Sequence, residues 1–126
     1  MSSVGYHEPI EEMSDETRDM HRAIVSLMEE LEAADWYNQR VDACKDPELR
    51  AILRHNRDEE KEHAAMVLEW IRRRDPCFDK FLHRYLFTSG PIEEIEERQE
   101  AAGEGEPRAP NGTLCIGSLR AAEVSS

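Results

Sequence analysis

Apolar residues recur every three or four positions in two long stretches of the chain, which is the spacing of an amphipathic helix. Ser14 suits the N-cap of the first stretch, and Pro47, which follows an aspartate, suits the first turn of the second. The pattern predicts two long helices, over about residues 14–43 and 47–74. Because the break between them is so short, the two helices should lie side by side as an antiparallel hairpin.

The next segment predicts a short third helix, then a frayed acidic helix around Ile92 and Ile95, and after that a loss of regular structure. Apolar residues between Phe78 and Leu86 form one face of this helix, which Gly90 and Pro91 should stop. From about Gln99 the composition shifts to Gly, Glu, Pro, Ala and Asn, which is typical of a linker. The expected organisation is an N-terminal arm, a helical domain, a flexible linker, a short apolar motif and a tail, over residues 1–13, 14–98, 99–113, 114–120 and 121–126.

The composition indicates a small helical domain that attracts cations. In a chain of 126 residues, 6% aromatic and 35% charged content predict a thin core, so its apolar faces should be buried against copies of itself. The formal charge of −12 argues against nucleic acids and anionic membranes as partners. Residues 14–43 carry eight acids against three bases, so a cation should approach along the first helix.

The chain has the features expected of a cytoplasmic protein. No apolar run approaches membrane-spanning length, and the first residues do not resemble a secretory signal. The three cysteines, Cys44, Cys77 and Cys115, form no Cys-x-x-Cys pair and are interpreted as reduced thiols.

A charged motif interrupts the apolar stripe of the second helix. At about 100° per residue, Glu60 and His63 fall in the same sector as Leu53, Val67 and Ile71. A carboxylate on a buried face is unfavourable unless it is neutralised, paired or bound to a metal. The Glu-x-x-His spacing places two metal ligands side by side, although an exposed charged helix face would produce the same spacing.

The first helix offers a third candidate ligand. Glu30 lies on the flank of the apolar stripe, where it could point inward or remain a solvated rim carboxylate. Tyr37 follows two turns later on the same side, within reach of a shared site or as an ordinary core aromatic.

These residues make up half of a ferritin-type di-iron site, which takes a Glu from each of two helices and a Glu-x-x-His from each of two others. A two-fold dimer is the simplest way to complete it, with both metals on the interface between chains. Four carboxylates match the charge of two Fe(II) ions, although Mn(II) or Zn(II) could bind the same atoms. The expected fold is all-α: a half-ferritin hairpin with a short third helix, which dimerises into a four-helix bundle.

The linker leads to an apolar motif near the end of the chain, Leu114-Cys115-Ile116-Gly117-Ser118-Leu119-Arg120. A short apolar motif on a flexible tether has the composition of a docking peptide, although an idle tail is the ordinary alternative.

Four segments carry a family resemblance: Met28-Glu29-Glu30-Leu31-Glu32-Ala33 with Asp35-Trp36-Tyr37, His55-Asn56-Arg57-Asp58-Glu59-Glu60-Lys61-Glu62-His63-Ala64, Tyr85-Leu86-Phe87-Thr88, and Ile116-Gly117-Ser118-Leu119-Arg120. Together they resemble the encapsulated ferritin-like proteins, the iron-oxidising cargo of encapsulin nanocompartments. The resemblance covers about residues 7–95 and the tail. The chain differs in having Cys115 where a small residue is expected, and in extending past the motif from Ala121.

The resemblance implies a two-helix half-ferritin whose dimers form the ferroxidase centre and assemble into an annular decamer. Its implied functional residues are Glu30, Glu60 and His63 as iron ligands, Glu29 and Glu32 at the entrance for metal, His55, Glu59 and Glu62 at an outer metal site, and Trp36 and Tyr37 beside the centre. The tail would dock the protein on the inner wall of an encapsulin shell, and Fe(II) oxidised at the dimer interface would mineralise inside that shell.

Two other functions use the same features. A rubrerythrin-like peroxide reductase has the same ligand set, but such enzymes usually add an electron-transfer module with Cys pairs, which this chain lacks. A non-catalytic helical hairpin that only oligomerises would bind no stoichiometric iron.

Overall fold

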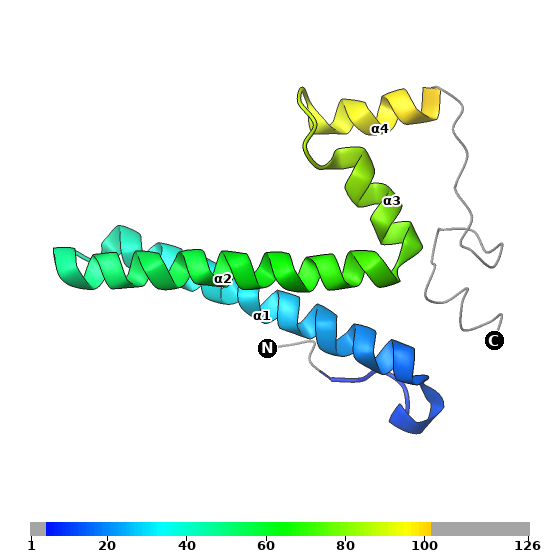
Figure 1. Cartoon of the computed structure of the whole chain (residues 1–126), viewed down its shortest axis with the longest axis horizontal. Helices are drawn as coiled ribbons and strands as arrows, with labels where there is room; N and C mark the ends of the chain where they lie inside the picture. Colours follow the sequence, from blue (N-terminus) through cyan, green and yellow to red (C-terminus); the bar gives the residue numbers. More distant parts are fainter. Residues whose placement is uncertain (1–4, 102–126) are drawn as a thin grey trace. The chain divides into compact units, whose positions relative to one another are not determined.

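The computed structural model describes residues 5–101, and every regular element in that range is helical. Two long helices, α1 and α2, are followed by the shorter α3 and α4, and a 3-10 turn, η1, precedes them all (Figure 1). The elements are η1 Ile10–Glu12, α1 Asp15–Ala43, α2 Pro47–Arg74, α3 Pro76–Tyr85 and α4 Ile92–Ala101. The chain divides into two compact units between Ile71 and Arg72. The predicted all-α class, with two long helices and a short third one, is confirmed.

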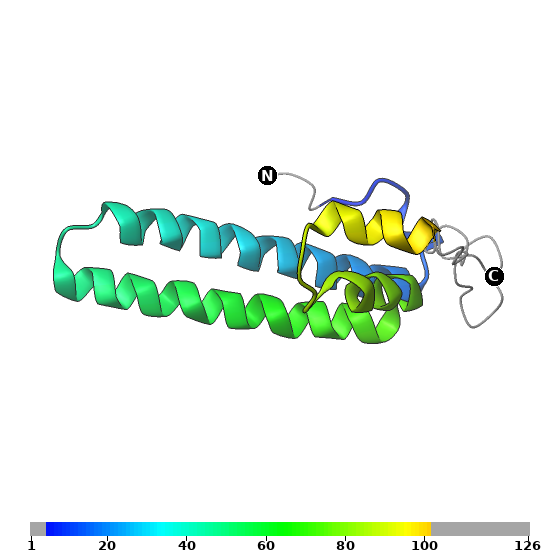
Figure 2. The same cartoon turned by 90° about the horizontal axis from the view of Figure 1, so that it is seen from above.

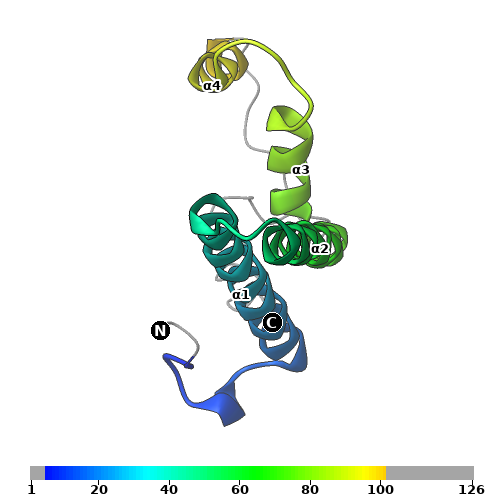
Figure 3. The same ribbon diagram turned by 90° about the vertical axis from the view of Figure 1, so that its left-hand side faces the viewer.

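The ends of α1 and α2 follow from capping residues that the sequence supplies. The Ser14 hydroxyl accepts a hydrogen bond from the backbone N–H of Thr17 at 3.1 Å, which satisfies a free donor at the start of α1. The Asp46 carboxylate does the same for the N–H of Leu49 at 2.8 Å, at the start of α2. A short turn joins the two helices, which run antiparallel beside each other (Figures 2 and 3).

The core of this hairpin is thin. Its buried apolar side chains are Met20, Val41, Ala64 and Ile71. Larger apolar residues on both helices stay exposed in the single chain: Ile24, Met28, Leu31 and Trp36 on α1, and Leu49, Ile52 and Met66 on α2. Two helices share only one seam, so a single hairpin cannot cover a wide apolar stripe on either helix. The part of the predicted stripe near Leu49 and Ile52 is therefore exposed.

The second unit holds α3 and α4. Asp75 caps α3 by accepting a hydrogen bond from the N–H of Phe78 at 3.0 Å. Asp79 on α3 is paired with Arg72 and with His83, whose Nδ1 lies 3.1 Å from the carboxylate. The loop after α3 contains Gly90 at a φ of 84°, a conformation that a residue without Cβ adopts readily.

The cysteines do not all follow the expectation from sequence. Cys44 is a free thiol at the turn between α1 and α2. Cys77 takes part in a disulfide, so the prediction that it is reduced is wrong. Among residues 5–101, no helix is both long and apolar enough to cross a bilayer.

We expect the Asp46 cap to hold the start of α2. Asp46→Ala removes the acceptor for the Leu49 N–H and should lower the free energy of unfolding by about 1 kcal/mol. Urea unfolding at fixed protein concentration measures this change. Asp42→Ala is the matched control, because it removes a nearby exposed carboxylate that caps no helix. Equal losses in the two variants would contradict the capping role.

Candidate metal centre

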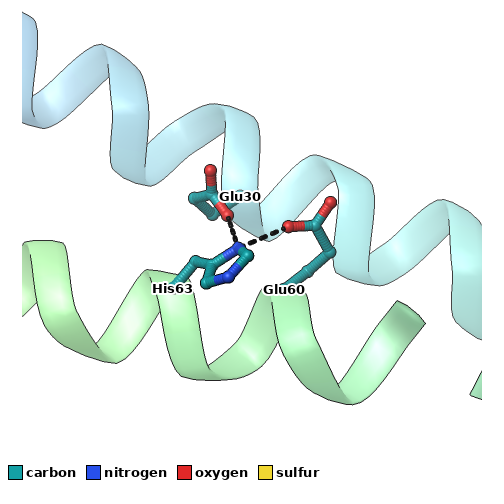
Figure 4. Close-up of side chains that lie close together, drawn as sticks. All are labelled: Glu30, Glu60 and His63. Atoms are coloured by element: carbon teal, nitrogen blue, oxygen red, sulfur yellow. Dashed lines mark hydrogen bonds and ion pairs between the residues drawn. The ribbon is translucent and has the colours of Figure 1, made fainter. Parts of the chain in front are cut away.

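The structure brings together one residue from α1 and two from α2. Glu30, Glu60 and His63 form a group, called the cluster below, in which one ligand atom from each lies within 4.8 Å of the others. His63 Nδ1 is 3.1 Å from Glu60 Oε1 and 3.2 Å from Glu30 Oε2 (Figure 4). The side chains of Glu30 and Glu60 are 26% and 24% exposed, so the cluster sits at the edge of the hairpin seam and remains open on one side.

One hydrogen cannot serve both carboxylates of the cluster. Nδ1 of an imidazole carries at most one hydrogen, and it is in hydrogen-bonding position to Glu60. Glu30 Oε2 lies at ion-pair distance from the same nitrogen, yet this buried oxygen has no hydrogen-bond partner. A buried acceptor without a partner is unfavourable, by about 1 to 3 kcal/mol and more for a charged group. The cluster therefore lacks a positive group.

The pKa values in the cluster reflect the same shortage. The pKa of Glu30 is raised above its ordinary value, first because burial removes water from the carboxylate, and then because Glu60 lies close to it. The pKa of His63 is also raised, chiefly by its hydrogen bond to Glu60, with the charges of both glutamates acting in the same direction. Glu30 and His63 therefore bind protons more tightly than they would as isolated side chains.

The donor set fits a divalent first-row metal. Carboxylate oxygen and imidazole nitrogen are donors that Fe(II), Mn(II) and Zn(II) accept. Two donors bound to one ion at about 2.1 Å each lie about 3 to 4 Å apart, and both distances from His63 Nδ1 fall in that range. A cation in the cluster would also give Glu30 Oε2 the partner that it lacks. Three ligands leave coordination positions open.

The remaining predicted site residues lie outside the cluster. Glu29, Glu32, His55, Glu59 and Glu62 are all exposed, and none belongs to a group of three possible metal ligands in the described part of the chain. Tyr37 is half-buried, and its ring contacts the Arg40 guanidinium at 5.1 Å. Trp36 is 50% exposed. The apolar motif at residues 114–120 lies outside the described residues.

The sequence interpretation missed a polar link beside the cluster. Arg57 Nη1 donates a hydrogen bond to Asn38 Oδ1 at 3.1 Å, between α2 and α1. A signal was present, because Asn38 continues the apolar period of the first helix at a position where an apolar residue is expected.

Long antiparallel helices that bring two glutamates and a histidine of a Glu-x-x-His pair together are characteristic of ferritin-like proteins. The model of the EncFtn-like family matches residues 5–89. The chain belongs to this family of encapsulated ferritin-like proteins, as its motifs predicted.

Relatives support this membership. The chain is 57% identical to the encapsulated ferritin-like protein of Rhodospirillum rubrum, an alignment that covers 94% of this chain and 90% of the relative. It is 36% identical to the encapsulin nanocompartment cargo protein EncC of Myxococcus xanthus, over 76% of this chain and 80% of the relative. The crystal structure of a Nitrosomonas europaea protein is similar with a TM-score of 0.68 and 77% identity, over 70% of this chain and 97% of that one.

The cluster predicts how the metal-free protein responds to pH. A raised pKa means that the folded state binds the proton more tightly than the unfolded state, so stability is present at low pH and is lost as pH rises. The loss from Glu30 begins above its ordinary pKa of 4.5, and that from His63 above 6.5. In the presence of a chelator, the melting temperature should therefore fall as the pH rises from 4.5 to about 8. The fall should be less steep in Glu30→Gln than in the wild type.

Circular dichroism melts across this range test the expectation. The chain has many other acids, so the informative quantity is the difference in slope between wild type and variant. If melting temperature depends on pH in Glu30→Gln and in His63→Gln as it does in the wild type, the raised pKa values of these two residues are contradicted.

Proposed function

We propose that this protein is a ferroxidase, which oxidises Fe(II) to Fe(III) at a di-iron centre formed between two copies of the chain. The observation that carries the proposal is the cluster, in which the one imidazole N–H is in hydrogen-bonding position to Glu60 and Glu30 Oε2 is left without a hydrogen-bond partner. Iron is the substrate of this reaction and occupies the centre while it reacts. Membership of a ferritin-like family agrees with a role in iron chemistry.

A second copy is needed because one chain supplies only half of the ligands. A di-iron carboxylate centre takes four carboxylates and two imidazoles, and the cluster offers two and one. A two-fold axis beside the cluster would double this set and give four negative charges for two divalent ions. The large apolar residues left exposed on α1 and α2 favour the same dimer, since a second hairpin would cover them.

Each residue of the cluster has a distinct role in this proposal. Glu60 bridges the two irons, while Glu30 and His63 each bind one of them. Each Fe(II) gives up one electron, so two irons together reduce O₂ to hydrogen peroxide, with two protons taken from water. Open coordination positions allow the oxidant to reach the irons. Tyr37 would donate a hydrogen bond near the centre when the dimer forms.

Exposed acids outside the cluster can assist the passage of iron. We propose that Glu29 and Glu32 on α1 attract Fe(II) to the entrance of the centre, because both are exposed and lie within one turn of Glu30. His55, Glu59 and Glu62 on α2 would form an outer metal site together with residues of other subunits.

Removal of the proposed bridging carboxylate should slow the oxidation of Fe(II). We expect Glu60→Ala to lower the initial rate of Fe(II) oxidation in air by at least about tenfold, because one metal ligand is lost from each half of the centre. Protein and Fe(II) are mixed without oxygen and then exposed to air, and the growth of Fe(III) absorbance measures the rate. Glu48→Ala is the matched control, because it removes an exposed glutamate of α2 far from the cluster.

Metal content and oxidant separate this proposal from its alternatives. Native mass spectra at several iron loadings should show two irons for each pair of chains. A protein without stoichiometric iron, or with Glu60→Ala as active as wild type, would be a helical oligomerisation module. Turnover driven by peroxide but not by O₂ would indicate a peroxide reductase.

We further propose that the protein works as cargo of an encapsulin shell, as an annular decamer of five dimers inside a cytoplasmic nanocompartment. The name of the Myxococcus xanthus relative describes it as encapsulin cargo. The docking peptide would be the motif Leu114, Ile116, Gly117, Ser118, Leu119 and Arg120, with Cys115 among them. The oxidised iron would then mineralise inside the shell, because an open ring has no closed cavity of its own.

Deletion of residues 114–120 tests the docking role. The truncated protein should no longer co-purify with the co-expressed shell protein, while its rate of Fe(II) oxidation is unchanged, because Glu30, Glu60 and His63 all lie outside the deleted segment. Affinity purification of the shell followed by mass spectrometry measures the association. Retained cargo loading would contradict the role of this motif, and lost oxidation would make the tail part of the catalytic fold.

A further inference from the structure

A hydrogen bond links α1 and α2 a short distance from the cluster. Arg57 Nη1 donates to Asn38 Oδ1 at 3.1 Å, and Arg57 Nε donates to the neighbouring Asp58 at 3.0 Å. The Arg57 side chain is only 19% exposed, against 57% for Asp58. Two acceptors at different sites on the guanidinium fix its orientation, so this side chain is held in one place between the helices.

The hydrogen bond between Asn38 and Arg57 and the cluster both require the same alignment of α1 along α2. Asn38 lies eight residues after Glu30 on α1, and Arg57 lies six residues before His63 on α2. At 1.5 Å per residue, Arg57 lies about 5 Å along α2 from Glu60, and Asn38 lies about 12 Å along α1 from Glu30, both on the side of the turn. A slide of one helix along the other by a single residue, about 1.5 Å, would break the link and separate Glu30 from His63.

Other features of the hairpin hold this register weakly. The buried apolar residues of the two long helices are few. The hydrogen bond between Arg57 and Asn38, by contrast, can form at only one alignment of α1 with α2.

We propose that Asn38 and Arg57 are a positioning pair, whose hydrogen bond keeps α1 and α2 in the register that assembles the cluster before metal binds. The inference rests on the metal centre proposed above. The pair acts through position and not through charge. The Arg57 guanidinium lowers the pKa of Asp58, whereas the pKa of Glu30 responds to burial, Glu60 and His63.

Substitutions at Asn38 separate the hydrogen bond from its surroundings. Asn38→Leu keeps the approximate shape but removes the acceptor, and Asn38→Asp keeps an oxygen acceptor for Arg57. Co(II) is the probe, because its visible spectrum reports coordination geometry without oxidation of iron. We expect Asn38→Leu to weaken Co(II) binding by about tenfold or more and to change the spectrum, since loss of supporting contacts around metal ligands has effects of this size. Asn38→Asp should match wild type.

Gln39→Leu is the matched control. Gln39 is the next residue of α1, and its amide bonds to Asp35 on the same helix at 3.0 Å. Gln39→Leu removes a side-chain amide from α1 but breaks no hydrogen bond to α2. Its Co(II) affinity and spectrum should therefore match those of the wild type. Arg57→Met, which keeps the aliphatic stem, should behave like Asn38→Leu, and the double variant should lose no more than either single one.

Each outcome bears on a different claim. Wild-type Co(II) affinity in Asn38→Leu, or equal weakening in Asn38→Leu and Asn38→Asp, would overturn the positioning role while leaving the metal centre intact. Absence of stoichiometric Co(II) binding by the wild type would overturn the metal centre and this inference together. If Asn38→Leu does not fold, Arg57→Met measured against Asn38→Asp decides the question.

Discussion

Two carboxylates that face each other across a helix seam, with one imidazole N–H between them, are the constraint on which this protein depends. Glu30 and Glu60 both lie within 3.2 Å of His63 Nδ1, which can donate to only one of them. In a fold selected for stability alone, this arrangement would be replaced by apolar side chains. Its presence on the seam means that the hairpin is built around a position that needs positive charge, supplied by a proton or by a metal ion.

The hairpin both supports the cluster and leaves it incomplete. Two helices can bury one seam, and the residues on that seam hold the three ligands from two sides. The same geometry leaves the open side of the cluster and several large apolar residues of α1 and α2 uncovered. In the proposed dimer, a second hairpin would cover these apolar residues and bring a second set of ligands to the cluster.

The charge of the chain is arranged to suit this role. Residues 14–43 carry a net charge of −5 out of −12, and Glu29 and Glu32 on either side of Glu30 are exposed. Exposed carboxylates lower the electrostatic potential at the surface and raise the local concentration of divalent cations. The Arg57 guanidinium, by contrast, bonds to Asn38 on α1 and to the neighbouring Asp58, so it links the helices without neutralising the cluster.

Local signals in the sequence determined the helices and the nomination of ligands. Ser14 and Asp46 cap α1 and α2, so the starts of these two helices could be predicted to within a residue. Helical periodicity placed Glu60 and His63 on the seam side of α2, because their spacing is set by one helix. Which residue of α1 meets them depends on the register and rotation between two helices, and neither is encoded in the period of either helix alone. Only the tertiary structure decided that Glu30 meets His63, and that Asn38 and Arg57 fix the contact.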